Sequence, residues 1–192
     1  MQPGDLLVFD GGDHSDVAHL VTDFLSNAIQ VVSHSNLTHS AMVYQVPTQL
    51  IESTILNGKS GPQLHDIAER IQSYPGRVWL LSLNPTFRKC LQFDAMWKLA
   101  DQKLQGDKYN IGELLKYVGR KIPIVSYIPA LYKSDAHAEV CSELVAQLLQ
   151  AGGMAGLRPA TMTPQSLAEL RIYDTCTQLC GAPASIRNFN TV

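Results

Sequence analysis

The sequence predicts an α+β fold in which an antiparallel sheet, or a partial barrel, packs against helices. Short β-prone runs recur early in the chain, and turns rich in glycine, proline and polar residues separate them. Longer segments with apolar residues at helical spacing lie between and after these runs. The 192 residues suffice for a sizeable core, so we expect a single domain over residues 1–192.

The N-terminal part of the chain predicts a strand, a helix and a hairpin. The apolar run at 6–9 predicts a short buried strand, and the glycine- and aspartate-rich stretch after it predicts a turn. Apolar residues with helical periodicity predict a helix over 17–32. Two β-prone runs, 38–45 and 49–56, flank Pro47, so we expect them to pair as a hairpin.

The middle of the chain predicts two helices around one strand. A short helix is expected over 64–73, then a strand over 78–83 adjacent to the hairpin. A longer amphipathic helix follows over 87–105, and Gly106 is placed to end it. Beyond it, prolines alternate with apolar residues in Ile122–Pro129, which indicates an irregular wall rather than a central strand.

The C-terminal part predicts two helices and a closing strand. Apolar residues recur at helical spacing in a run that begins at Cys141 and ends at Gly152-Gly153. Thr163-Pro164 is typical of a helix cap followed by a first-turn proline. The run 172–179 predicts a last strand.

Composition limits the class of partner. A hydrophobic content of 45% and a charged content of 17% are ordinary for a globular protein. The formal charge of −2, without a basic run, argues against a nucleic-acid partner. The start of the chain resembles no signal peptide and no apolar run is long enough to span a bilayer. We therefore expect a cytoplasmic protein without an integral membrane segment, and export by another route stays open.

The four cysteines do not indicate a disulfide framework. Cys176 and Cys180 are separated by three residues rather than the two of a redox or zinc pair, and no second close Cys/His pair completes a metal site. We therefore expect neither a metal nor another cofactor. Cys90 lies inside an expected helix among apolar neighbours, so we interpret it as structural.

Cys141 is the strongest candidate for a reactive side chain. It begins the expected helix, where unpaired backbone N–H groups and the positive end of the helix dipole favour a thiolate. The thiolate is the nucleophilic form of cysteine, and it needs a nearby base. A lone cysteine is about as often a small buried apolar residue, and it is the helix-start position that favours a nucleophile.

His39 is the preferred candidate for the base. It lies at the start of an apolar strand between the small residues Thr38 and Ser40, whereas the other histidines, including His65, have polar or helix-surface settings. Glu52 falls on the adjacent strand of the hairpin, where a carboxylate can accept the imidazole N–H and fix its tautomer. A partly buried structural histidine and a strand-edge charge that discourages aggregation are the plainer alternatives.

Together these motifs resemble the NlpC-type cysteine amidohydrolases, which combine a tyrosine-bearing loop, a cysteine-led helix, a Gly-Asp-Leu strand and a histidine-bearing strand. The same pieces occur here in rotated order, at Gly4–Phe9, Thr38–Val43, Ile51–Ser53, Gly106–Tyr109 and Val140–Val145. This order is similar to the circularly permuted, papain-like branch of that superfamily, which also holds relatives of lecithin retinol acyltransferase. The resemblance covers most of the chain.

The resemblance implies one permuted papain-like domain with a cysteine nucleophile. It assigns the nucleophile to Cys141, the base to His39 and the residue that orients the base to Glu52. It places Tyr109 and Ser142 beside the substrate.

Two features depart from the family pattern. Glu143 stands where ordinary members carry glycine, and its charge would oppose a thiolate if it faced the sulfur, so we expect it to face away. The expected helix over 17–32 is a long insertion relative to the shortest members.

Three functions remain open from the sequence. The first is a cysteine hydrolase that cleaves an amide bond, in a small peptide, a cell-wall (peptidoglycan) fragment or an isopeptide-like substrate, through a thioester intermediate. The second is an acyltransferase or lipid esterase that uses the same Cys-His site on an acyl substrate, which an apolar groove beside Cys141 would favour. The third is a binding module without catalysis. The sequence leaves the oligomeric state open.

Overall fold

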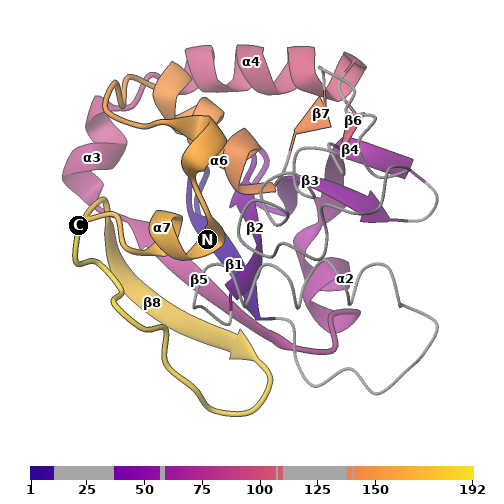
Figure 1. Cartoon of the computed structure of the whole chain (residues 1–192), viewed down its shortest axis with the longest axis vertical. Helices are drawn as coiled ribbons and strands as arrows, with labels where there is room; N and C mark the ends of the chain where they lie inside the picture. The colour runs from indigo at the N-terminus through magenta and orange to yellow at the C-terminus, as the bar shows by residue number, and fades with distance from the viewer. Residues whose placement is uncertain (11–36, 57–58, 107, 110–137, 140) are drawn as a thin grey trace, which may run out of the picture.

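The first strand of the chain, β1 (Leu6–Asp10), lies in the middle of a six-stranded antiparallel sheet (Figure 1). It pairs with β2 (Leu37–Val43) on one side and with β5 (Arg77–Leu83) on the other. All of β1 is buried, which explains why its sequence is a continuous apolar run rather than an alternating one.

The computed structural model describes residues 1–10, 37–56, 59–106, 108–109, 138–139 and 141–192. Within them the sheet order is β4-β3-β2-β1-β5-β8. The three remaining strands are β3 (Gln49–Leu56), β4 (Lys59–Asp66) and β8 (Tyr173–Cys180). The expected α+β fold, with an antiparallel sheet packed against helices, is confirmed.

Helices cover both faces of this sheet (Figure 1). They are α2 (Ile67–Gln72), α3 (Pro85–Cys90), α4 (Phe93–Gly106), α6 (Cys141–Ala151) and α7 (Pro164–Ala168), with a short 3-10 helix η4 (Pro159–Thr161). A separate parallel pair joins β6 (Lys108–Tyr109) to β7 (Ala138–Glu139). α6 packs on β2 and β3 and also contacts α4 and α7.

The alternation of side chains along β1 divides the apolar interior into two cores. Leu6 and Val8 belong to the larger core, which the buried faces of α4, α6 and α7 complete. Leu7 and Phe9 belong to the smaller core, which Ile67 of α2 covers from the other face. The sheet is therefore apolar on both sides along its central strands.

The expected hairpin is confirmed, and the strand expected after it lies elsewhere. β2 and β3 pair antiparallel at Met42 with Ile51 and at Val43 with Leu50. β5, which we expected adjacent to the hairpin, is separated from it by β1 and pairs with β8 on its other side. β1 lies between β2 and β5 because both of its faces are buried and both of its edges pair with a neighbouring strand.

Two helix predictions need correction. The helix expected over 64–73 begins only at Ile67, and the residues before it form β4, which pairs with β3 along its whole length. That pairing overrides the weak local β-propensity of a run containing Gly61 and Pro62. The helix expected over 87–105 is two helices, α3 and α4, because the backbone turns extended at Leu91.

The remaining C-terminal expectations agree with the structure. α6 ends just before Gly152, Thr163 caps α7 with a capping box to Ser166, and β8 closes the sheet at one edge. The expected helix at 17–32 and the irregular wall at 122–129 lie outside the described residues.

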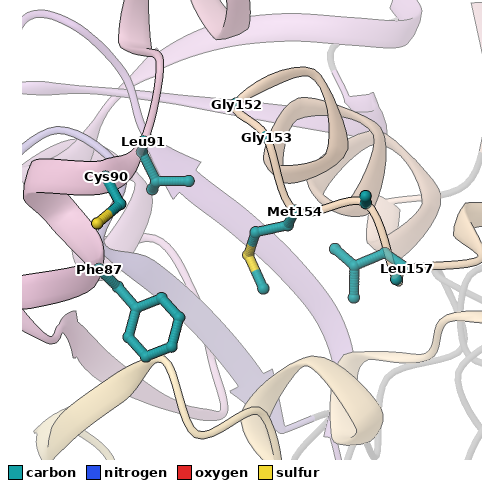
Figure 2. Close-up of a pocket in the computed structure, with 9 residues that line it drawn as sticks. Phe87, Cys90, Leu91, Gly152, Gly153, Met154 and Leu157 are labelled. Atoms are coloured by element: carbon teal, nitrogen blue, oxygen red, sulfur yellow. The ribbon is translucent and has the colours of Figure 1, made fainter.

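An apolar pocket of about 290 Å³ lies at the C-terminal end of α6 (Figure 2). Phe87 and Cys90 of α3 line one side, and Met154 and Leu157 line the other. Cys90, which we interpreted as structural, is exposed in this pocket because α3 ends at that residue instead of continuing into α4. The sulfur of Cys90 is therefore open to solvent.

None of the helices in the described part of the chain combines the length and the apolar character that a membrane crossing requires.

The packing of α6 gives a stability prediction. Leu148 is fully buried in the larger core, so we expect Leu148→Ala to lower the free energy of unfolding by about 2–5 kcal/mol. Gln150→Ala, at an exposed position of the same helix, should change it by less than about 0.5 kcal/mol. Urea unfolding of both variants measures the difference, and equal losses would contradict the packing described here.

Candidate active site

Cys141 is the first residue of α6, and its side chain is almost completely buried. The helix is held in place by its apolar face, which packs into the larger core through Leu144, Val145 and Leu148. The thiol therefore sits at the positive end of a helix that cannot move freely against the sheet. This local setting is the one expected from the sequence.

His39 lies on β2 at the place where β2 and β3 separate. β2 pairs with β3 at Met42 with Ile51 and at Val43 with Leu50, while β1 follows β2 further, with Phe9 opposite His39. The rings of Phe9 and His39 lie 5.2 Å apart. One side of the imidazole thus packs on Phe9 of the sheet, and α6 contacts both β2 and β3.

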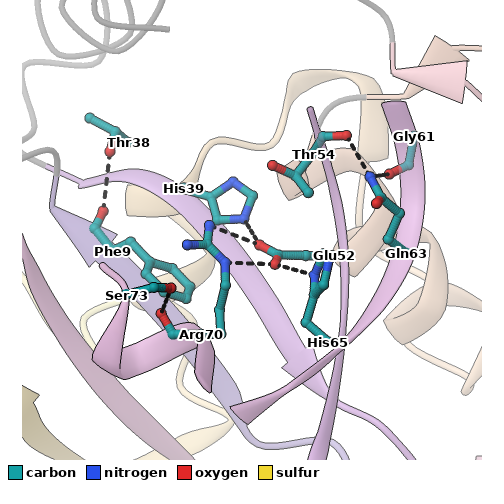
Figure 3. A network of polar contacts seen from close by, with 10 residues as sticks. All are labelled: Phe9, Thr38, His39, Glu52, Thr54, Gly61, Gln63, His65, Arg70 and Ser73. Atoms are coloured by element: carbon teal, nitrogen blue, oxygen red, sulfur yellow. Dashed lines mark hydrogen bonds and ion pairs between the residues drawn. The ribbon is translucent and has the colours of Figure 1, made fainter. Parts of the chain in front are cut away.

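Glu52, on β3, has no exposed side-chain surface and accepts hydrogen bonds from three basic side chains (Figure 3). His39 Nε2 donates to its Oε2, and His65 Nδ1 donates to its Oε1 over 2.7 Å. Arg70 bridges both oxygens, with Nε 2.8 Å from Oε1 and Nη2 3.4 Å from Oε2. The expected contact between Glu52 and the base is present.

The Arg70 guanidinium offsets the free-energy cost of burying the Glu52 carboxylate. A buried charge is costly unless it is paired and hydrogen-bonded, and Arg70 supplies both a charge and two donors. Its Cζ atom lies 5.2 Å from the Phe9 ring centroid and 5.4 Å from that of Tyr74, so aromatic faces hold the guanidinium. Asp66, which caps α2, fixes the helix that carries Arg70.

These partners keep Glu52 ionised. Burial alone would raise the pKa of the carboxyl group, but the charges and hydrogen bonds of His39, His65 and Arg70 outweigh it and hold the pKa well below its usual range. Glu52 therefore presents a permanent negative charge to His39 throughout the physiological pH range.

The pKa values of Cys141 and His39 move in opposite directions. Burial alone would lower the pKa of His39, but the Cys141 sulfur and the Glu52 carboxylate outweigh it and raise the pKa to about 9. Burial would raise the pKa of the Cys141 thiol, whereas His39 and the adjacent Ser40 lower it below its ordinary value. The pair is therefore favoured as a thiolate and an imidazolium, and since Glu52 occupies Nε2, Nδ1 is the nitrogen left for the sulfur.

The sequence also singles out Tyr109, Ser142 and Glu143, and the described structure places each of them against residues other than Cys141 and His39. The backbone of Tyr109 pairs with Glu139, two residues before Cys141, and its side chain lies outside the described part of the structure. Ser142 is buried and its hydroxyl donates to the carbonyl of Met162 over 2.7 Å, so its proton is used within the fold. Glu143 accepts a hydrogen bond from Gln147, one turn further along α6.

Sequence reasoning missed two residues of this site. His65 was assigned a polar surface setting, but β4 places it opposite Leu50, on the face of the sheet that also carries Glu52. A strand prediction for 59–66 would have placed His65 on the same face as Glu52, because side chains on one face of a strand recur every second residue. Arg70 carries no such signal, since only the turn from β4 into α2 brings it over the carboxylate.

We expect Glu52→Gln to lower the free energy of unfolding by about 3–5 kcal/mol at pH 7, because Arg70 would lose its buried counter-charge. The folded-state pKa of Glu52 is depressed, so its contribution is present above the ordinary glutamate pKa and is lost as the pH falls through the folded value. The difference between wild type and variant should therefore shrink on acidification.

Urea unfolding of both proteins at pH 7 and in the acid range tests this expectation. Glu69→Gln, at an exposed position of α2, is the control and should change stability by less than about 0.5 kcal/mol. A penalty for Glu52→Gln that does not change with pH would contradict the described charge pairing.

The sequence matches no known family model, and a comparison with curated proteins finds no match. The assignment of this site therefore depends on the chain's own residues and on their geometry.

Proposed function

We propose that the chain is a cysteine hydrolase that cleaves an amide bond with Cys141, His39 and Glu52. One observation carries the proposal: a thiol at the start of a buried helix interacts with an imidazole whose far nitrogen is held by a buried carboxylate. This is the arrangement that an activated cysteine needs, because each neighbour favours the charged form of the next.

In the first half of the proposed reaction, the Cys141 thiolate attacks the carbonyl carbon of the amide. The backbone N–H of Cys141, which has no acceptor within its own helix, donates to the oxyanion that forms. The His39 imidazolium then gives its Nδ1 proton to the nitrogen of the leaving amine as the carbon–nitrogen bond breaks. The product on the protein is a thioester, and His39 is left neutral.

In the second half, neutral His39 takes a proton from a water molecule, which attacks the thioester carbonyl. The carbon–sulfur bond breaks, a carboxylic acid leaves, and Cys141 returns as a thiolate beside the imidazolium. Glu52 stabilises the imidazolium in both halves and holds the ring so that Nδ1 faces the sulfur.

An amide substrate is preferred over a long-chain ester because the described apolar pocket does not adjoin the thiol. That pocket lies at the C-terminal end of α6, whereas Cys141 begins the helix. At about 1.5 Å per residue, the length of α6 separates them by roughly 15 Å. A small peptide, an isopeptide or a cell-wall fragment is the proposed substrate class, and no cofactor is required.

The thiolate is tested by the pH dependence of alkylation. We expect iodoacetamide to label Cys141 faster than exposed Cys90 at pH 6, because the lowered pKa of the Cys141 thiol raises its thiolate fraction there. His39→Ala should move the half-point of Cys141 labelling to higher pH. Mass spectrometry of a short pulse gives the rate at each cysteine, with Cys141→Ala as the blank. Labelling of Cys141 only at alkaline pH would exclude an activated thiolate.

Catalysis itself is tested on a panel of peptides, isopeptides, peptidoglycan fragments and acyl esters. Cys141→Ala and Cys141→Ser should lower amide turnover by at least about a thousandfold, because the hydroxyl of serine is a far weaker nucleophile than a thiolate. Cys90→Ala should retain full activity, since that thiol lies in the distant pocket. Turnover of long-chain esters alone would reassign the site to acyl transfer, and binding without turnover would favour a binding module.

The pH profile of the wild-type enzyme gives a further expectation. Activity should rise as Cys141 ionises on the acid side and fall as the pH passes about 9, where His39 loses the proton that it must give to the leaving amine. A profile that keeps rising through pH 10 would contradict the role of His39 as the acid.

A further inference from the structure

Ser40 follows His39 on β2, and its side chain is completely buried. In the described part of the chain its hydroxyl oxygen has no hydrogen-bond partner of ordinary length and angle. A buried hydroxyl without a partner costs about 1–3 kcal/mol, and such groups are rare in folded proteins. Alanine, which has no polar side-chain atom, would avoid that cost, so the serine needs an explanation.

The position of Ser40 on the strand shows which way its side chain faces. Successive side chains of a strand point to opposite faces, so Ser40 lies on the same face as Met42 and opposite to His39. Met42 belongs to the larger core, together with Leu144 and Val145 of α6. The side chain of Ser40 is therefore directed toward the helix that begins with Cys141.

The backbone of Ser40 is also available to the helix. β2 pairs with β3 at Met42 and Val43, and this pairing does not extend to Ser40. The packing of α6 on β2 buries Ser40 and Cys141 together, and the backbone N–H and the hydroxyl of Ser40 both lower the pKa of the thiol. A neutral thiol is a weak acceptor, whereas a thiolate accepts strongly, so the hydroxyl acquires a full partner only when the sulfur is charged.

We propose that Ser40 is a positioning residue for the nucleophile, whose hydroxyl and backbone N–H form a two-donor cradle for the Cys141 sulfur. This proposal depends on the proposed function and adds a positioning residue to the same site. The cradle holds the thiolate from the side opposite to the His39 imidazolium, so the sulfur is stabilised from two directions. The hydroxyl, which would lack a full partner beside a neutral thiol, then has an acceptor in the thiolate.

Ser40→Ala separates this role from a merely structural one. It removes the hydroxyl, keeps the backbone N–H and leaves the other site residues in place. If the hydroxyl were only a buried misfit, its removal would stabilise the fold and leave the thiol unchanged. The proposed role predicts a fold of equal or greater stability together with a less acidic Cys141.

The experiment is the iodoacetamide pH profile of Cys141 in the full chain, measured by mass spectrometry, together with urea unfolding. In Ser40→Ala we expect the half-point to rise by about one pH unit, which makes labelling about tenfold slower at pH values well below both half-points. Ser82→Ala, on β5, which β1 separates from β2, is the control and should keep the wild-type profile.

The two proposals fail in distinguishable ways. A wild-type half-point at the ordinary pKa of cysteine would overturn both the activated thiolate and the cradle. A low wild-type half-point that Ser40→Ala leaves unchanged would overturn the cradle alone, and the amidase proposal would stand.

Discussion

The ion pair between the Glu52 carboxylate and the Arg70 guanidinium is the interaction on which the site depends. Glu52 is fully buried, and it keeps its charge because Arg70 bridges both of its oxygens. That charge stabilises the His39 imidazolium, and the imidazolium in turn stabilises the Cys141 thiolate. The dependence runs in one direction: without a compensated carboxylate, His39 loses the partner that fixes its orientation, and the pKa of the Cys141 thiol is lowered less. The pairing of β4 with β3 and the short helix α2 hold Arg70 in place, so these peripheral elements help to set the charges of the site.

The sheet also separates the two halves of the site. The carboxylate and its cationic partners occupy the face of the smaller core, where Phe9 packs against both His39 and Arg70. Cys141 comes from the face of the larger core, on α6. β2 joins the two faces because His39 and Ser40 are consecutive residues with opposite orientations. The Glu52 carboxylate itself is fully buried, while its three basic partners keep a small exposed fraction.

Much of this arrangement could be predicted from sequence, and the failures have physical reasons. The helix led by Cys141 and the hairpin that carries His39 and Glu52 follow from periodicity over short distances, which is a local property. β4 escaped prediction because its sequence is poor in β-formers and it owes its conformation to pairing with β3. The break between α3 and α4 follows from a tertiary contact, in which Gln92 N–H donates to the carbonyl of Gly152 at the end of α6. Arg70 reaches Glu52 only because β4 pairs with β3 and then turns into α2, so no sequence pattern marks Arg70.

The central position of β1 has a consequence for biosynthesis. Its two hydrogen-bonding edges pair with β2 on one side and with β5 on the other. The partner residues in β5 lie about seventy positions further along the chain. β5 itself is closed only by β8, which ends at Cys180. Such non-local pairing slows folding, and a nascent chain cannot complete the sheet until β8 has left the ribosome. Cys141 is translated before β8, so α6 packs on a sheet whose β5 edge stays open until β8 follows.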